Sequence, residues 1–336
     1  MSARPLTVAL DLDGSLESMG DSMTDLADAL EATGEVELVR WRSGSTPAGP
    51  GEVRVLARPL WSPGWRRALG PAVDRLIHDV DLVHVAGRLT PPTRALPLVV
   101  SVDDLRPLRD ESREHQRVRA LERVVARGAW IAASTRAARH EVLAVLGADP
   151  ARVAVVPPAV PRVESPGDGR ALVVNVTGVL QPVLDLAPAL VDLVASLGGR
   201  VVVLASDQAA ARLRALGAAV EVRARREARR TLGEARVVWH VSDGARFPSF
   251  AIAALGAGVP TLARATAVNR ELLSGAAALV ASDAEVRPLV EELWTNEARR
   301  ALAAGAGRDR ASDFAPARAV RGYLSLYHEV VRGLGS

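Results

Sequence analysis

The feature that most constrains this chain is the alternation of short apolar runs with longer amphipathic segments. Twelve runs rich in Val, Leu and Ala, from LTVALDL (6–12) to AALVASD (277–283), are separated by Ala-, Leu- and Arg-rich stretches of helical periodicity. The runs are apolar almost throughout, as are strands buried on both faces of a parallel sheet. The pattern predicts stacked βαβ units and therefore an α/β fold.

A linker candidate divides these runs into two series. The chain has 336 residues, enough for about two domains of ordinary size. The segment PPAVPRVESPGDG (157–169) is rich in Pro, Gly and Ser and falls between the sixth and seventh runs. We therefore expect an N-terminal domain over 1–160 and a C-terminal domain from 161, with a ligand held between them at the carboxyl ends of the strands.

The composition excludes several classes of function. The chain has no Cys, which excludes disulfides, thiolate metal sites and Cys nucleophiles. All 42 basic residues are Arg, yet the net charge is only +3 and aromatic residues make up 3%. Nucleic-acid binding would need a basic face with stacking rings, so no nucleic-acid partner is expected. The densest basic run, RARREARR (223–230), is interpreted as a solvated helix face.

No apolar run approaches the roughly 20 residues that a membrane helix needs, and the N-terminus lacks a basic-then-apolar signal pattern. We expect a cytoplasmic protein whose membrane contact is at most peripheral. No two histidines have the spacing of metal ligands, so no metal site is expected. His84 is interpreted as a satisfied core residue, and His240 lies in an apolar strand where a ligand role is the lesser alternative.

The first predicted strand ends in VALDLDGSL (8–16), which resembles the first motif of haloacid-dehalogenase-type phosphatases. That resemblance implies that Asp11 attacks phosphorus, that Asp13 handles the proton, and that Mg²⁺ lies between them. The chain lacks the Lys that such an enzyme uses, and one such domain does not account for the second strand series. A strand-end Asp is also common in βαβ units, where it caps a helix or a loop. The phosphatase is therefore kept as a distant alternative.

A second resemblance runs in order along almost the whole chain. The stretches VALDLDGSLESMGDSMTDLADAL (8–30), DLVHVAG (81–87), PLVVSVDDLRPL (97–108) and ASTRAARHEVLAVLGADPARVAVVPPAV (133–160) are similar to the N-terminal half of family-4-type retaining glycosyltransferases. The stretches VTGVLQP (176–182), FPSFAIAALGAGVPTLA (247–263) and FAPARAVRGYLSLYHEVV (314–331) are similar to the C-terminal half. The resemblance implies a GT-B fold of two facing Rossmann-like domains with parallel sheets.

In that family, the N-terminal domain holds the acceptor and the C-terminal domain holds a nucleotide sugar. The resemblance thus implies domains over 1–160 and 161–312, and a closing helix over 313–336 that crosses back to the first domain. It also implies a nucleotide sugar and a carbohydrate or small-molecule acceptor as partners, with no metal and no cofactor. An Arg and a Lys would stabilise the leaving diphosphate, two Glu would bind the sugar and the ribose, and a His would lie near the reacting sugar.

This chain departs from the family at most of those positions. The Arg and Lys positions correspond to Val183 and Leu184, and the two Glu positions to Ala245 and Ala253. The His position corresponds to Asp103. No catalytic residue of the family is thus retained. Replacing both cations by aliphatic side chains would lower the rate by on the order of 10⁴-fold or more.

The remaining ligand-binding candidates come from strand ends and loops. They are Gly20, Asp103, Ser134, Gly178, Arg246 and Arg264. The two glycines could bring backbone N–H groups near an anion, and the two arginines could reach a phosphate, although turn glycines and surface arginines are the simpler interpretation.

Two functions remain in competition. One is a degenerate homologue, a pseudoenzyme that binds or scaffolds and assists an active glycosyltransferase partner. The other is an active, hexosyltransferase-like enzyme with a divergent donor pocket. The residues favour the first.

Overall fold

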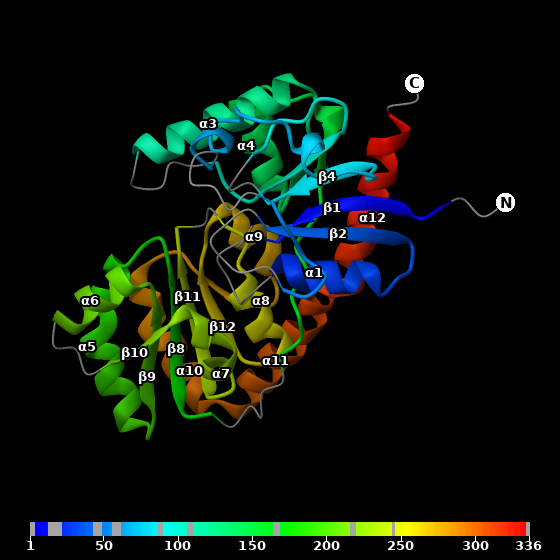
Figure 1. The fold of residues 1–336 in the computed structure, drawn as a ribbon. Coiled ribbons are helices and arrows are strands. Elements are labelled where there is room, and N and C mark those ends of the chain that lie inside the picture. The colour runs from blue at the N-terminus through cyan, green and yellow to red at the C-terminus, as the bar shows by residue number, and fades with distance from the viewer. Residues whose placement is uncertain are drawn as a thin grey trace. The chain divides into compact units, whose positions relative to one another are not determined.

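The computed structural model describes residues 4–12, 22–42, 49–55, 62–86, 90–105, 111–163, 169–215, 220–243 and 246–333. These residues form two compact units (Figure 1). The first unit comprises the chain up to Ala159 together with the segment from Pro316 onward, and the second unit runs from Val160 to Ala315.

The first unit contains a parallel sheet whose seven described strands lie in the order β3-β2-β1-β4-β5-β6-β7. The strands are β1 (Leu6–Asp11), β2 (Val36–Arg42), β3 (Val53–Arg54), β4 (Leu82–Val85), β5 (Leu98–Val102), β6 (Trp130–Ala133) and β7 (Val153–Val155). The strand order reverses between β1 and β4. In open parallel sheets, ligands bind beside such a reversal at the carboxyl ends of the strands.

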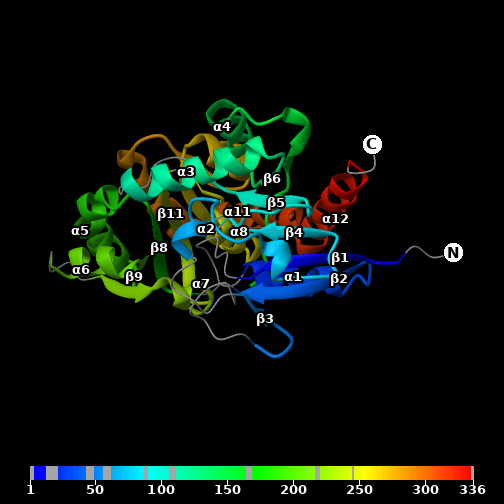
Figure 2. The same cartoon turned by 45° about the horizontal axis from the view of Figure 1, so that its top comes forward.

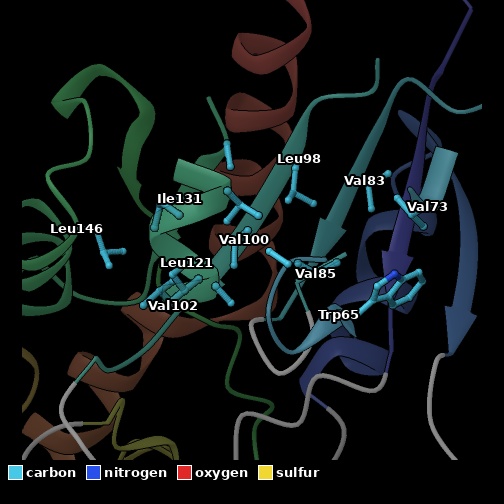
Figure 3. Packing of buried hydrophobic residues seen from close by; sticks show 14 of the residues in the cluster. Trp65, Val73, Val83, Val85, Leu98, Val100, Val102, Leu121, Ile131 and Leu146 are labelled. Atoms are coloured by element: carbon cyan, nitrogen blue, oxygen red, sulfur yellow. The ribbon is translucent and has the colours of Figure 1, made fainter. Parts of the chain in front are cut away.

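Helices cover both faces of this sheet. They are α1 (Ser22–Glu31), α2 (Ser62–Trp65), α3 (Glu111–Ala126), α4 (Arg136–Leu146) and α12 (Pro316–Arg332), with the 3₁₀ turns η1 (Val73–Arg75) and η2 (Pro150–Arg152). Figure 3 shows one face, where Trp65, Leu121 and Leu146 pack on side chains of β4, β5 and β6. On the other face, α1 and α12 pack on β1, β4 and β5.

Local sequence explains where α4 begins and ends. The hydroxyl of Thr135 accepts a hydrogen bond from the N–H of Ala138 and so caps the first turn. Gly147 ends the helix with a φ of 59°, a left-handed conformation that glycine adopts without steric cost. The sequence of the first and last turns therefore sets the limits of α4.

The second unit contains a parallel sheet whose six described strands lie in the order β10-β9-β8-β11-β12-β13. The strands are β8 (Ala171–Thr177), β9 (Arg200–Ala205), β10 (Glu221–Ala224), β11 (Ala235–Ser242), β12 (Thr261–Arg264) and β13 (Ala278–Val280). Each sheet has the doubly wound order of a Rossmann-like domain. The predicted α/β class with parallel sheets is thus confirmed in both units.

The helices of the second unit are α5 (Gln181–Ser196), α6 (Asp207–Ala215), α7 (Ala228–Leu232), α8 (Ser249–Gly256), α9 (Ala267–Leu273), α10 (Val286–Thr295) and α11 (Glu297–Ala311). The 3₁₀ turns are η3 (Arg225–Glu227), η4 (Asp283–Glu285) and η5 (Ser312–Phe314). Side chains of α5 and α10 form one core with β8, β9 and β11. None of the helices in the described part of the chain is long and apolar enough to cross a membrane.

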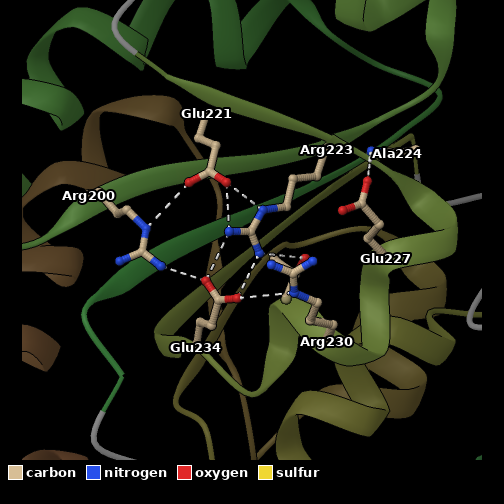
Figure 4. Close-up of polar contacts among 8 residues, drawn as sticks. Arg200, Glu221, Arg223, Ala224, Glu227, Arg230 and Glu234 are labelled. Carbon is tan, nitrogen blue, oxygen red and sulfur yellow. Dashed lines mark hydrogen bonds and ion pairs between the residues drawn. The ribbon is translucent and has the colours of Figure 1, made fainter.

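The basic run at 223–230 differs from its interpretation as a solvated helix face. Arg223 belongs to β10, and its side chain is only 10% exposed because Glu221 and Glu234 pair with it. Arg200 and Arg230 pair with the same Glu234, as Figure 4 shows. The carboxylates raise the pKa of the Arg223 guanidinium further above its already high value. The start of the run is therefore a strand held by ion pairs.

Candidate functional site

The carboxyl ends of β5 and β6 bring two of the predicted site residues together. Asp103 directly follows β5 and Ser134 directly follows β6, where Val102 and Ala133 are partners in the sheet register. The Ser134 N–H donates to the carbonyl of Val102 (3.1 Å), so Asp103 and Ser134 are neighbours. Among the described residues, the buried Ser134 hydroxyl finds no hydrogen-bond partner. A hydroxyl group of a ligand could supply one.

A buried polar cluster lies on the same sheet, between the strands and α12. Nδ1 of His84 lies 2.7 Å from the Tyr327 hydroxyl, and its Nε2 lies 2.8 Å from the Ser101 hydroxyl. The Ser101 hydroxyl is also 3.3 Å from the hydroxyl of Tyr323. Burial, together with the negative charge of Asp103, raises the pKa of Tyr323 to about 12. The cluster therefore links the C-terminal helix to the strands that end near Asp103.

His84 is a fully buried, neutral imidazole in this cluster. Burial lowers its pKa to about 3. Because both ring nitrogens have hydroxyl partners, the prediction of a satisfied core histidine is confirmed.

The other predicted residues of the first unit lie at the end of a different strand or outside the described residues. Asp11 ends β1 and is 1% exposed. Asp13 and Gly20 lie outside the described residues, so the Asp11–Asp13 pair stays a prediction. Across the described ranges, no group of three or more His, Asp or Glu side chains is placed to hold a metal ion.

The carboxyl edge of the second sheet has Gly178 directly after β8 and Asp243 directly after β11. The N–H of Asp243 donates to the carbonyl of Thr177 (3.2 Å), which extends the pairing of the two strands. Gly178 has a φ of 84°, and a Cβ added there would overlap the carboxylate of Asp243. The turn after β8 therefore depends on glycine, because the carboxylate of Asp243 occupies the space of a Cβ.

Val183 and Leu184, in the first turn of α5, face the apolar core. Val183 is 2% exposed, and Leu184 packs against the same apolar cluster. The N–H groups of Val183 and Leu184 both donate to the carbonyl of Leu180, at 3.0 and 3.2 Å, and Pro182 has no N–H. These groups are therefore not presented to a ligand in this conformation.

The remaining candidates of the second unit lie near α8 and β12. Ala253 is 2% exposed in α8, and Ala245 lies outside the described residues. Arg246 is half-buried between β11 and α8. Arg264 ends β12, and its carbonyl accepts from the side-chain amide of Asn269 (2.8 Å). The predicted binding role of these arginines stays a prediction.

Sequence reasoning missed Arg225, which also reaches this edge. It follows β10, and its Nη2 donates to the carbonyl of Val176 in β8, 2.7 Å away and two residues before Gly178. Its guanidinium thus reaches from the edge strand to the centre of the sheet. The available signal was its position directly after the apolar run that forms β10, because a residue that follows a parallel strand lies at the carboxyl edge of the sheet.

His240 is buried in β11 beside Asn175 of β8. The Asn175 amide nitrogen donates to Nδ1 of His240 (3.0 Å), which places the ring proton on Nε2. Burial, and then the positive charge of Arg225, lower the pKa of His240 to about 4. The imidazole is therefore neutral at pH values near 7.

Comparisons with known proteins identify this architecture. Residues 19–163 match the sequence model of the family described as Glycosyltransferase Family 4. A search of curated proteins found no match. Among solved structures, a glycosyltransferase from Rickettsia africae superposes with a TM-score of 0.69 and 11% identity, covering 98% of this chain and 99% of the other.

Two further structures agree with that result. Sucrose-phosphate synthase from Thermosynechococcus elongatus has a TM-score of 0.69 and 14% identity, covering 98% of this chain and 100% of the other. HepE of Anabaena, solved in complex with UDP and glucose, has a TM-score of 0.66 and 13% identity, covering 98% and 99%. At these identities the likeness defines the fold, which is GT-B. This is the fold that the sequence resemblance implied, and the match to the family model covers residues 19–163 of the first unit and the start of the second.

Proposed function

We propose that this chain is a glycosyltransferase homologue in which sugar transfer is weak or absent, and which binds or scaffolds for an active glycosyltransferase. Residues 1–160 would form the acceptor-side domain, residues 161–312 the nucleotide-sugar side, and no metal would take part. The observation that carries the proposal is the chemistry at the ends of β8 and β11. Where the family places two cations, Val183 and Leu184 pack into the core. The carboxylate of Asp243 lies against Gly178 in the loop that would face a diphosphate.

The loss of two cations beside the diphosphate is large enough to predict weak rather than full activity. A preorganised donor beside a developing negative charge is worth about 3 kcal/mol. Losing two such groups corresponds to on the order of 10⁴-fold in rate. The buried Ala253 also has no polar group for a sugar or ribose hydroxyl. The proposal therefore rests on missing charge and missing hydrogen bonds together.

Calorimetric titration with UDP-, GDP- and ADP-glucose tests the proposal, combined with an assay for released nucleoside diphosphate. UDP and UDP-glucose are the first probes, since HepE of Anabaena was solved with both. We expect no micromolar binding and no release above the rate without protein. Micromolar binding accompanied by turnover would overturn the proposal.

Arg225 favours a second candidate function, an active transferase with a divergent donor pocket. Its guanidinium bonds to the carbonyl of Val176, close to the loop where the family cations are missing. The matched pair of variants Arg225→Gln and Arg226→Gln tests this role, because Arg226 is the exposed neighbour. If turnover is found, loss of it in Arg225→Gln alone would support the second candidate. Equal activity in both variants would contradict it.

On the first unit, the neighbouring Asp103 and Ser134 would bind a polar acceptor or ligand. A carboxylate accepts hydrogen bonds from sugar hydroxyls, and the buried Ser134 hydroxyl would gain a partner. A Ser134→Ala variant that binds every tested sugar as the wild type does would contradict this assignment.

A further inference from the structure

Five arginines gather on one surface of the first unit, which we call the arginine patch: Arg66, Arg67, Arg119, Arg123 and Arg127. All five are exposed. Three of them follow one another at four-residue spacing along α3 and its C-terminal turn, so they lie on one side of that helix. The other two come from the segment that follows α2 (Figure 2).

Hydrogen bonds join the two parts of the patch. Nη1 of Arg123 donates to the carbonyl of Arg67 (2.6 Å), and Nη1 of Arg127 donates to the carbonyl of Ala68 (3.3 Å). Each guanidinium has five N–H donors, so both retain donors for another ligand. The arginines of α3 are thus held beside Arg66 and Arg67.

The charges of the patch are not neutralised within the described protein. None of the five arginines forms an ion pair with a described residue, whereas Arg40 and Arg223 each pair with two carboxylates. The exposed Glu122 on α3 offsets part of the charge. Five guanidinium groups on one face, none with an ion pair to a described residue, lie in a chain whose net charge is only +3, and they favour an anionic partner at this face.

An exposed apolar side chain lies in the same segment. Leu69 is 46% exposed, while its neighbour Ala68 is fully buried with a φ of 51°, a left-handed conformation unusual for alanine. The N–H of Leu69 donates to the carbonyl of Gly64 (2.9 Å), which helps to fix the turn. The strained turn therefore presents Leu69 to solvent, two residues after Arg67 of the arginine patch.

We propose that the arginine patch and Leu69 form a docking surface for an anionic lipid surface. Guanidinium groups bind lipid phosphates in pairs of hydrogen bonds, and a leucine inserts into the boundary between headgroups and acyl chains. The patch exposes no described aromatic ring, so it lacks the stacking platform of a single-stranded nucleic-acid site. The combination of charge and one apolar anchor is that of a protein bound at a membrane surface.

Co-sedimentation with vesicles tests this proposal on the full chain. We expect binding to phosphatidylcholine vesicles that contain about 30% phosphatidylglycerol, no binding to pure phosphatidylcholine, and weaker binding in about 0.5 M salt. The double variant R66Q/R67Q should weaken binding by about 25-fold, since each basic residue near an anionic surface contributes about fivefold. Leu69→Ser should weaken it further at constant charge.

Matched controls come from the second unit. R212Q/R214Q removes the same charge from exposed positions of α6, and Leu302→Ser removes a leucine that is 70% exposed on α11. Both should bind vesicles as the wild type does. The proposal is overturned if anionic vesicles do not bind the chain, or if the control R212Q/R214Q loses as much affinity as R66Q/R67Q. Binding to DNA or heparin without binding to vesicles would also overturn it.

Discussion

Lowering the pH from about 7 to about 5 should destabilise the first unit through His84. In the folded chain its pKa is about 3, because burial disfavours the charged ring. In the unfolded chain its pKa is about 6.5. Below about pH 6.5 the unfolded state therefore binds a proton that the folded state does not bind until about pH 3. The contribution of His84 to the free energy of unfolding is complete above pH 6.5 and falls by about 1.4 kcal/mol per pH unit below it, or about 2 kcal/mol at pH 5.

Two measurements follow this effect. Proton NMR of the imidazole C–H groups should show that the His84 ring stays neutral to below pH 5. Urea unfolding at several pH values should give a steeper loss of stability on acidification in the wild type than in His84→Gln. The buried His240 contributes a slope of its own, which persists in that variant.

Two control variants separate the titration from the packing. Tyr327→Phe removes one hydrogen-bond partner of His84, so the free energy of unfolding should fall by about 1–3 kcal/mol at every pH while the slope persists. The exposed His328→Gln should leave the free energy of unfolding at pH 7 unchanged. If His84 titrates near pH 6.5 in the folded chain, or if His84→Gln keeps the full slope, the reasoning from burial is wrong.

Two further substitutions test local contacts in the second unit by thermal or urea unfolding. Gly178→Ala should lower the free energy of unfolding by about 2 kcal/mol or more, since the new Cβ requires a left-handed backbone and overlaps the carboxylate of Asp243. Gly147→Ala, at a left-handed position with open space around it, should lower it by about 1 kcal/mol. Equal losses of stability in the two variants would contradict the overlap. Glu234→Gln should lower the free energy of unfolding by about 1 kcal/mol, because it weakens the ion pairs around Arg223. High salt should reduce this difference in stability from the wild type, and a difference that salt does not change would argue against an ionic origin.

The fold could be predicted from the sequence because its signals are local. Each predicted strand has a counterpart in the structure, since most strands of a parallel sheet are buried and therefore largely apolar. The limits of α4 followed from Thr135 and Gly147, whose capping roles depend only on the adjacent turn. The added edge strand β3 has two residues, too few to give a period.

The polar sites could be predicted only in part, because their partners are distant in the chain. His84 could be identified as a core residue, but its partner Tyr327 lies 243 positions away, on a helix that packs on the strand only in the folded unit. Asp103 and Ser134 could be placed at strand ends, while their contact depends on the register of β5 and β6. Arg225 was assigned to a helix face, and its partner Val176 lies 49 positions away in the chain.

Whether an arginine is available to a ligand depends on its partners in the fold rather than on the density of basic residues around it in the sequence. Arg223 lies in the densest basic run, yet two carboxylates neutralise it. Arg310 donates hydrogen bonds to the carbonyls of Glu271 and Leu272 in α9 and to the carboxylate of Asp313. The patch around Arg66 has no comparable run, because its members come from two segments that meet only in the folded unit. Since a guanidinium stays charged at every pH of interest, its field is cancelled only by a nearby anion. The arginine patch, whose members form no ion pair with a described residue, is therefore the surface that we propose for an anionic partner, whereas carboxylates neutralise the start of the basic run.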